Sequence, residues 1–184
     1  MNIHEILSAI GVVGTIIGVF MVYDTLKCNH DWNRRKYTLD IMKEWNDNVM
    51  RYAIEVERVC PHLFDIDKKS STIVELTLEQ ATKIYTSTSQ KEEDKDNVVV
   101  RHALNSILNQ FEFLATAYMQ NVADKQIIEE SFKKQLIRLH KILSNYLKVV
   151  EEHRKYQPWE PYINLVEKWE FEDKQKKDIR KPTA

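Results

Sequence analysis

An uninterrupted apolar run lies near the start of the chain. Residues 6–23 read ILSAIGVVGTIIGVFMVY and contain no charged side chain. At roughly 1.5 Å per residue, a helix of this length spans about 27 Å, close to the hydrocarbon thickness of a bilayer. A cleaved signal peptide would begin with basic residues, whereas residues 1–5, MNIHE, contain neither lysine nor arginine. The run predicts an uncleaved transmembrane helix at 6–23, with a short extracytoplasmic stub at 1–5.

Beyond this run, hydrophobic residues recur at three- and four-residue spacing, which is typical of amphipathic helices. The first such series is Thr38, Met42, Trp45, Val49, Ala53 and Val56. The predicted helices cover residues 24–60, 72–86, 97–120, 125–155 and 162–169. Pro61 is expected to end the first of them, and Asp124 is expected to cap the fourth.

The predicted fold class is all-α, with the transmembrane helix followed by a cytoplasmic helical bundle at 24–171. Helices 97–120 and 125–155 are expected to form an antiparallel hairpin, on which the 24–60 helix packs. The remaining residues, 172–184, are highly charged and are expected to form a flexible tail.

Glycine is confined to the apolar run. The chain has three glycines, Gly11, Gly14 and Gly18, and none after them. A glycine-free stretch of this length favours helices joined by simple loops, because hairpin turns and bulges need glycine. The three glycines also share one face of the predicted transmembrane helix, and Gly14 and Gly18 form a GxxxG pattern. Such a face lets helix backbones approach closely, which predicts self-association in the membrane.

Basic residues follow the apolar run but do not precede it. Lys27, Arg34, Arg35 and Lys36 come after it, so the positive-inside rule places the C-terminal domain in the cytoplasm. The expected location is the inner membrane, in a single-pass arrangement with the N-terminus outside. Arg34, Arg35 and Lys36 also form a membrane-proximal basic group that could contact anionic lipid. The formal net charge of -1 gives no reason to expect nucleic acid as a partner.

No catalytic or cofactor-binding motif is present. The chain lacks a phosphate-binding glycine loop, a G-x-S-x-G nucleophile motif and an H-E-x-x-H metal motif. Its histidines are scattered, and only His102 and His140, on the two helices of the predicted hairpin, could meet. No metal or cofactor is therefore expected, and the chain is not expected to be an enzyme.

Glu112 is the one candidate polar site. It lies between Phe111 and Phe113 in an apolar helix, where an unpaired buried carboxylate would be costly. It is either a ligand or proton site, a structural partner of Arg35 or Arg138, or simply exposed.

Three stretches resemble a known family. Residues 35–46 read RKYTLDIMKEWN, residues 107–115 read ILNQFEFLA before the VAD at 122–124, and residues 159–162 read WEPY, with a tryptophan at 169. Together they resemble the domain of unknown function 4760 family, whose members often pair an N-terminal membrane helix with such a domain. The family often has a glycine in the turn where this chain has Asn121 and Val122. The resemblance implies no activity and no catalytic residues.

These features predict a membrane-anchored, non-enzymatic domain that acts by binding a ligand or a protein. Its expected partners are the lipid bilayer and either a second copy of the chain or another protein. One alternative is an oligomeric, ligand-gated membrane effector of a bacterial signalling or antiphage defence system. A membrane-bound enzyme is the remaining alternative, which would need a nucleophile or metal cluster that the sequence does not reveal.

Overall fold

The computed structural model describes residues 3–61, 63–64 and 75–179. Every regular element in this part of the chain is helical, which confirms the predicted all-α fold class. The elements are α1 (Ile3–Val59), α2 (Leu78–Thr86), the short 3-10 helix η1 (Glu92–Asp94), α3 (Lys95–Met119), α4 (Lys125–Ile142), α5 (Ser144–Arg154) and α6 (Glu160–Ile179).

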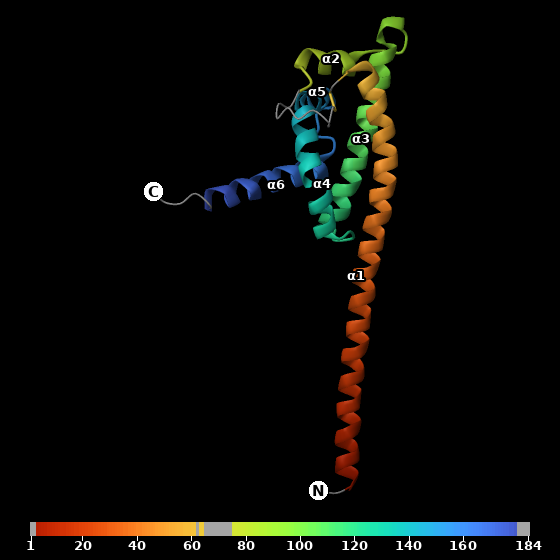
Figure 1. Ribbon diagram of the computed structural model, residues 1–184, viewed down its shortest axis with the longest axis vertical. Coiled ribbons are helices and arrows are strands. Elements are labelled where there is room, and N and C mark those ends of the chain that lie inside the picture. The colour runs from red at the N-terminus through yellow and green to blue at the C-terminus, as the bar shows by residue number, and fades with distance from the viewer. Residues whose placement is uncertain (1–2, 62, 65–74, 180–184) are drawn as a thin grey trace.

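Helix α1 joins the apolar run and the predicted 24–60 helix into one continuous element. Its C-terminal half packs on the bundle, whereas its N-terminal half extends well beyond it (Figure 1). At about 1.5 Å per residue, the 57 residues of α1 span roughly 85 Å. The helix ends at Val59, ahead of Pro61, as the sequence predicts.

Helix α3 is the centre of the bundle. It packs chiefly against α1 and α6, and also against α2. Its buried side chains are Val100, Ala103, Leu104, Ile107, Leu108, Phe111, Leu114, Ala115, Ala117 and Tyr118. Burial of an apolar side chain of the larger kinds contributes about 1.5–3 kcal/mol, so this helix supplies much of the stability of the fold.

The turn between α3 and α4 is tied to α1 by a network centred on Thr38 and Asp124. The fully buried Thr38 hydroxyl accepts a hydrogen bond from the backbone N–H of Asp124 (2.7 Å) and donates to the carbonyl of Arg34 (2.7 Å). The Asp124 carboxylate caps α4 by accepting from the backbone N–H groups of Gln126 and Ile127, as predicted. Asn121 adopts a left-handed conformation with φ of 59°, which asparagine tolerates better than most residues.

The predicted helix 125–155 is in fact two helices, α4 and α5, that meet at Leu143. A distant segment causes the break. The backbone N–H of Leu76 donates to the carbonyl of Ile142 (3.0 Å), and the side-chain amide of Asn145 donates to the carbonyl of Leu76 (2.8 Å). An inserted partner of this kind is a recognised cause of a helix kink.

The start of α6 is a strained position that holds a large side chain in the core. Trp159 has φ of 60°, and a bulky residue in that region costs about 1–3 kcal/mol. The buried Trp159 indole N–H donates to the side-chain carbonyl of Asn109 on α3 (2.7 Å). This contact anchors the α5–α6 connection to the central helix and offsets the strain.

Two further boundaries differ from the predictions. Helix α2 begins at Leu78, because Thr77 and Gln80 form a capping box; residues 72–74 lie outside the described part. Helix α6 continues to Ile179, past the predicted end of the domain at 171, and Lys133 pairs with Asp173 on this extension (2.6 Å). The rest of the predicted tail, 180–184, is outside the described residues.

Helices α3 and α4 are antiparallel (Figure 1), but their mutual contact is small because α6 packs against both.

Among the described residues, no helix is both long and apolar enough to cross a membrane. The backbone of the predicted transmembrane segment at 6–23 is helical, but the side chains of residues 6–14 and 16 within it lie outside the described part.

We predict that Thr38→Val destabilises the fold by about 1–3 kcal/mol. The substitution keeps the shape of the side chain but leaves the Asp124 backbone N–H without its partner. Thermal unfolding of the full chain in detergent, followed by circular dichroism, measures the effect. Thr82→Val is the matched control, because the exposed Thr82 hydroxyl bonds only to the Leu78 carbonyl of its own helix. Equal melting temperatures for the two variants would contradict the role assigned to Thr38.

Candidate ligand pocket

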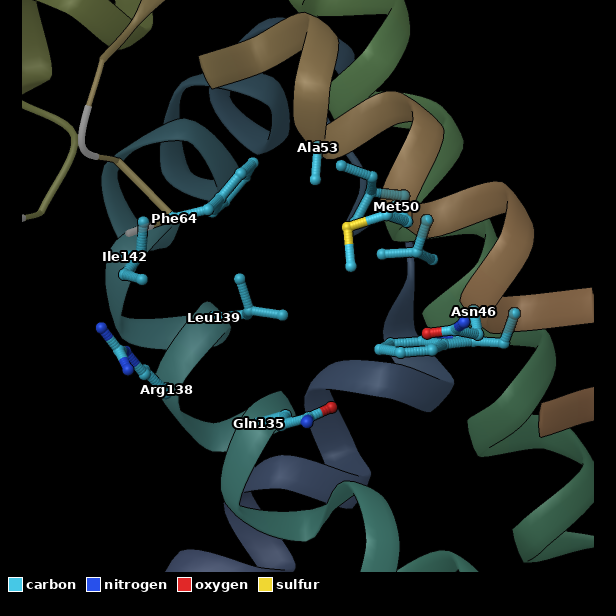
Figure 2. A pocket seen from close by; sticks show the side chains of 11 residues that line it. Asn46, Met50, Ala53, Phe64, Gln135, Arg138, Leu139 and Ile142 are labelled. Carbon is cyan, nitrogen blue, oxygen red and sulfur yellow. The ribbon is translucent and has the colours of Figure 1, made fainter. Parts of the chain in front are cut away.

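A pocket of about 170 Å³ lies between α1 and α4 (Figure 2). Helix α1 and helix α4 provide its two walls, with Ile107 of α3 and Phe64 of the segment after α1 completing it. Its lining residues are Trp45, Asn46, Val49, Met50, Ala53, Phe64, Ile107, Gln135, Arg138, Leu139 and Ile142.

The pocket exists because its two walls are held by different neighbours. Helix α1 packs mainly on α3, and α4 packs mainly on α6, so the direct contact between α1 and α4 is slight. The small side chain of Ala53 faces the space from α1, and Leu139 points into it from α4 (Figure 2). The gap between these two side chains is left unfilled.

The pocket has a buried base and an open rim. Val49, Ile107 and Ile142 are buried, whereas Met50 is 53% exposed and Asn46 and Gln135 are also exposed. A space of this form admits a molecule from solvent while presenting apolar surface at its base.

Polar and apolar side chains divide the lining. Figure 2 shows Arg138 at the left of the space, Gln135 below it and Asn46 at its right, with the apolar residues Ala53 and Phe64 above them. The guanidinium group of Arg138 is directed away from the middle of the space. The side chains that face the interior are therefore apolar groups and neutral amides.

Aromatic packing makes the Trp45 end of the pocket rigid. The Trp45 ring stacks on Phe111 at a centroid distance of 5.9 Å and meets Phe132 edge-on at 4.7 Å. Its indole N–H is buried and has no hydrogen-bond partner among the described residues. Both aromatic partners come from other helices, α3 and α4, so this cluster joins three helices beside the pocket.

Glu112 lies on α3 but does not line the pocket. It is half-buried, and the neighbouring Phe113 is 50% exposed, so this face of the helix reaches solvent. Arg35, one of the partners considered for Glu112, instead forms an ion pair with Asp124 (3.3 Å). Within the described part of the chain, no hydrogen bond or ion pair of Glu112 is found, which is consistent with partial exposure.

The basic group after the apolar run is divided between two environments. Arg34 donates to the carbonyl of Ala123 (2.9 Å), and Arg35 pairs with Asp124, so both hold the α3–α4 turn. Lys36 is exposed. The sequence could not reveal these contacts, because their partners lie 89 residues away in the chain.

Among the three glycines of the predicted packing face, the structure describes the surroundings of Gly18. A Cβ atom added at Gly18 would meet nothing within 4 Å, so its surface is open in the single chain. The surroundings of Gly11 and Gly14 lie outside the described residues, and the packing role of the three glycines stays a prediction.

The two histidines that the hairpin might have brought together lie in different environments. His102 is exposed, whereas His140 is half-buried, with its ring edge-on to Tyr162 at 5.7 Å. The Nδ1 atom of His140 is buried and has no partner among the described residues. Burial lowers the pKa of His140 below its ordinary value of 6.5, although Glu170 and Glu167 act in the opposite direction. Among the described residues, no group of three metal-ligating side chains could hold a metal ion.

The comparisons with known proteins agree with the resemblance noted in the sequence. The family model described as "Domain of unknown function (DUF4760)" matches residues 6–169. The chain belongs to this family. No curated protein and no solved structure matches the chain.

We predict that His140 makes the fold less stable below pH 6.5. Because its pKa is lowered in the folded state, the unfolded chain takes up a proton first as the pH falls. The contribution is fully present above pH 6.5 and is lost progressively below it. The decrease in melting temperature between pH 7 and pH 5 should be smaller for His140→Gln than for the unmodified chain. His102→Gln, at an exposed position, should show the same decrease in melting temperature as the unmodified chain. An equal decrease for the two variants would contradict the role assigned to His140.

Proposed function

We propose that this protein is a membrane-anchored, non-enzymatic helical domain that acts by binding a ligand or a protein partner. The observation that carries the proposal is the continuity of α1. This one helix contains the apolar N-terminal run and, in its C-terminal half, a wall of the pocket.

Exposed apolar side chains near the start of α1 support the anchor. The side chains of Ile17, Val19, Phe20, Met21, Val22 and Tyr23 are each at least 50% exposed, so the described part of the chain leaves them largely uncovered. A contiguous apolar surface of this kind is unfavourable in water and marks a membrane or protein contact. The charge-free sequence at 6–23 extends the same surface towards the N-terminus, and a bilayer would cover all of it.

The proposed orientation places the bundle in the cytoplasm and the N-terminus outside the inner membrane. Basic residues occur after the apolar run and not before it, which favours this topology. Between Tyr23 and Arg34, where contact with the α3–α4 turn begins, α1 rises about 16 Å. The bundle would therefore lie a short, helical distance from the bilayer surface.

The composition of the pocket supports binding over catalysis. Its described lining contains no serine, cysteine, histidine, aspartate or glutamate. Catalysis needs convergent groups that exchange protons, attack substrate or stabilise charge. Apart from Arg138, whose guanidinium is directed away from the space, the described lining consists of neutral amides and apolar side chains, which serve recognition.

A second candidate function is a ligand-gated, oligomeric membrane effector in bacterial signalling or defence. Helix α1 favours this candidate because it would connect the pocket directly to the membrane segment. Association of chains through the face of Gly11, Gly14 and Gly18 would assemble the oligomer, and Gly18 has open space for a neighbour.

We predict that charges within the apolar run release the full chain from membranes. Ile10→Asp with Ile17→Asp adds two carboxylates near the centre of the proposed span, at a cost of about 2.5–3.5 kcal/mol each. The readout is the fraction of protein that stays in the pellet after alkaline carbonate extraction. Leu39→Asp with Ile54→Asp is the matched control, since both residues are exposed on α1 beyond the run. Retention of the first variant in the pellet would refute the anchor.

We predict that Gly14→Ile with Gly18→Ile weakens self-association in a membrane two-hybrid assay. Isoleucine side chains on this face would prevent close approach of two helix backbones. Val13→Ile alters the same stretch but a different face and should leave the signal unchanged. A double variant that associates as strongly as the unmodified chain would rule out the glycine face as the contact.

A further inference from the structure

We propose that the pocket between α1 and α4 binds a small, uncharged amphipathic molecule with one ring-sized apolar body and one amide-like polar group. This inference rests on the proposed binding function and gives it a ligand class and a location. The protein's anchor is a separate matter, since the pocket lies within the bundle.

The volume of the pocket limits the size of the apolar body. A space of about 170 Å³ is far smaller than the sites of drug-sized ligands, which start at roughly 300 Å³. A dry cavity of roughly 150 Å³ holds a benzene-sized molecule. The enclosed part of the ligand is therefore about one ring, or a branched aliphatic group of similar size.

The base of the pocket selects an apolar body. Val49, Ile107 and Ile142 are buried there, and Leu139 and Ala53 point into the space from opposite walls. A ligand ring between these side chains would remove apolar surface from water on both α1 and α4. It would also contact the Trp45 ring, which packs on Phe111 and Phe132 behind it.

The rim selects a neutral polar group. Asn46 of α1 and Gln135 of α4 lie on the two walls, both lower in the view than Ala53 and Phe64 (Figure 2). Each carboxamide offers both a donor and an acceptor, so a ligand amide can be matched by both. The described lining contains no carboxylate, and its single cationic residue, Arg138, directs its guanidinium away from the interior. At this rim a carboxylate could use only the N–H groups of the two carboxamides, whereas a ligand amide could use both their N–H and their C=O groups.

Phenylacetamide and phenylacetate are the probes that test this proposal on the full chain in detergent. They share a benzene ring and differ in the charge of the polar group. Binding is followed through the indole N–H resonance of Trp45, assigned by its absence in Trp45→Phe, and through calorimetry. Phenylacetamide should bind saturably and at least five times more tightly than phenylacetate. No saturable binding of phenylacetamide, or tighter binding of phenylacetate, would overturn the proposal.

Three variants locate the site. Ala53→Phe fills the space and should weaken phenylacetamide binding at least tenfold, whereas Ile54→Phe, on the adjacent exposed position, should not. Asn46→Leu with Gln135→Leu removes the amides from exposed positions and should abolish the preference for phenylacetamide. Unchanged binding in Ala53→Phe would place the probe elsewhere and reject the pocket. Because carbonate extraction tests the anchor independently, a chain that stays in membranes but binds no probe would refute the pocket alone.

Discussion

The hydrogen bond between the Thr38 hydroxyl and the Asp124 backbone N–H is the constraint on which the arrangement of the bundle depends. It joins the middle of α1 to the first residue before α4, across 86 positions of sequence. The Asp124 carboxylate caps α4, and Arg35 pairs with the same carboxylate. One residue thus starts a helix and ties it to α1. The exposed ion pair adds little energy, so the buried hydroxyl carries most of the connection.

This joint also explains why a pocket can persist beside a well-packed core. It holds α1 and α4 together at the N-terminal end of α4, while further along the two helices follow different partners, α3 and α6. At the far end, the backbone of Leu76 bonds to the last residue of α4, Ile142. The α4 wall is therefore held at both ends, and the Trp45 cluster stiffens the side between them. The space results from the way in which the two helices are held in place. Close packing elsewhere in the core does not fill it.

Local chemistry was enough to predict much of the fold. The spacing of Thr38, Val49 and Val56 identified a helix face that is buried in the structure, and Pro61 and Asp124 marked helix ends by their own backbone and side-chain properties. Long-range contacts decided the rest. The break at Leu143 depends on Leu76, and the pairing of Arg35 depends on a turn 89 residues away. The pocket could not be predicted from the sequence for the same reason. Asn46 and Gln135 are ordinary polar positions until α1 and α4 are placed face to face.

Whether ligand binding in the pocket could influence the apolar run depends on the difference between the ligand's affinities for two arrangements of α1. From Tyr23 to Trp45, α1 rises about 33 Å without a break in the helix, so a change in its tilt against α4 would reach the apolar run as a rigid displacement. A ligand shifts such an equilibrium only by the difference between its affinities for the two arrangements. The pocket meets this requirement geometrically, because its walls belong to different helices and a ligand between them contacts both. A ligand that contacted α1 alone would bind equally well at any tilt and would leave the apolar run unaffected.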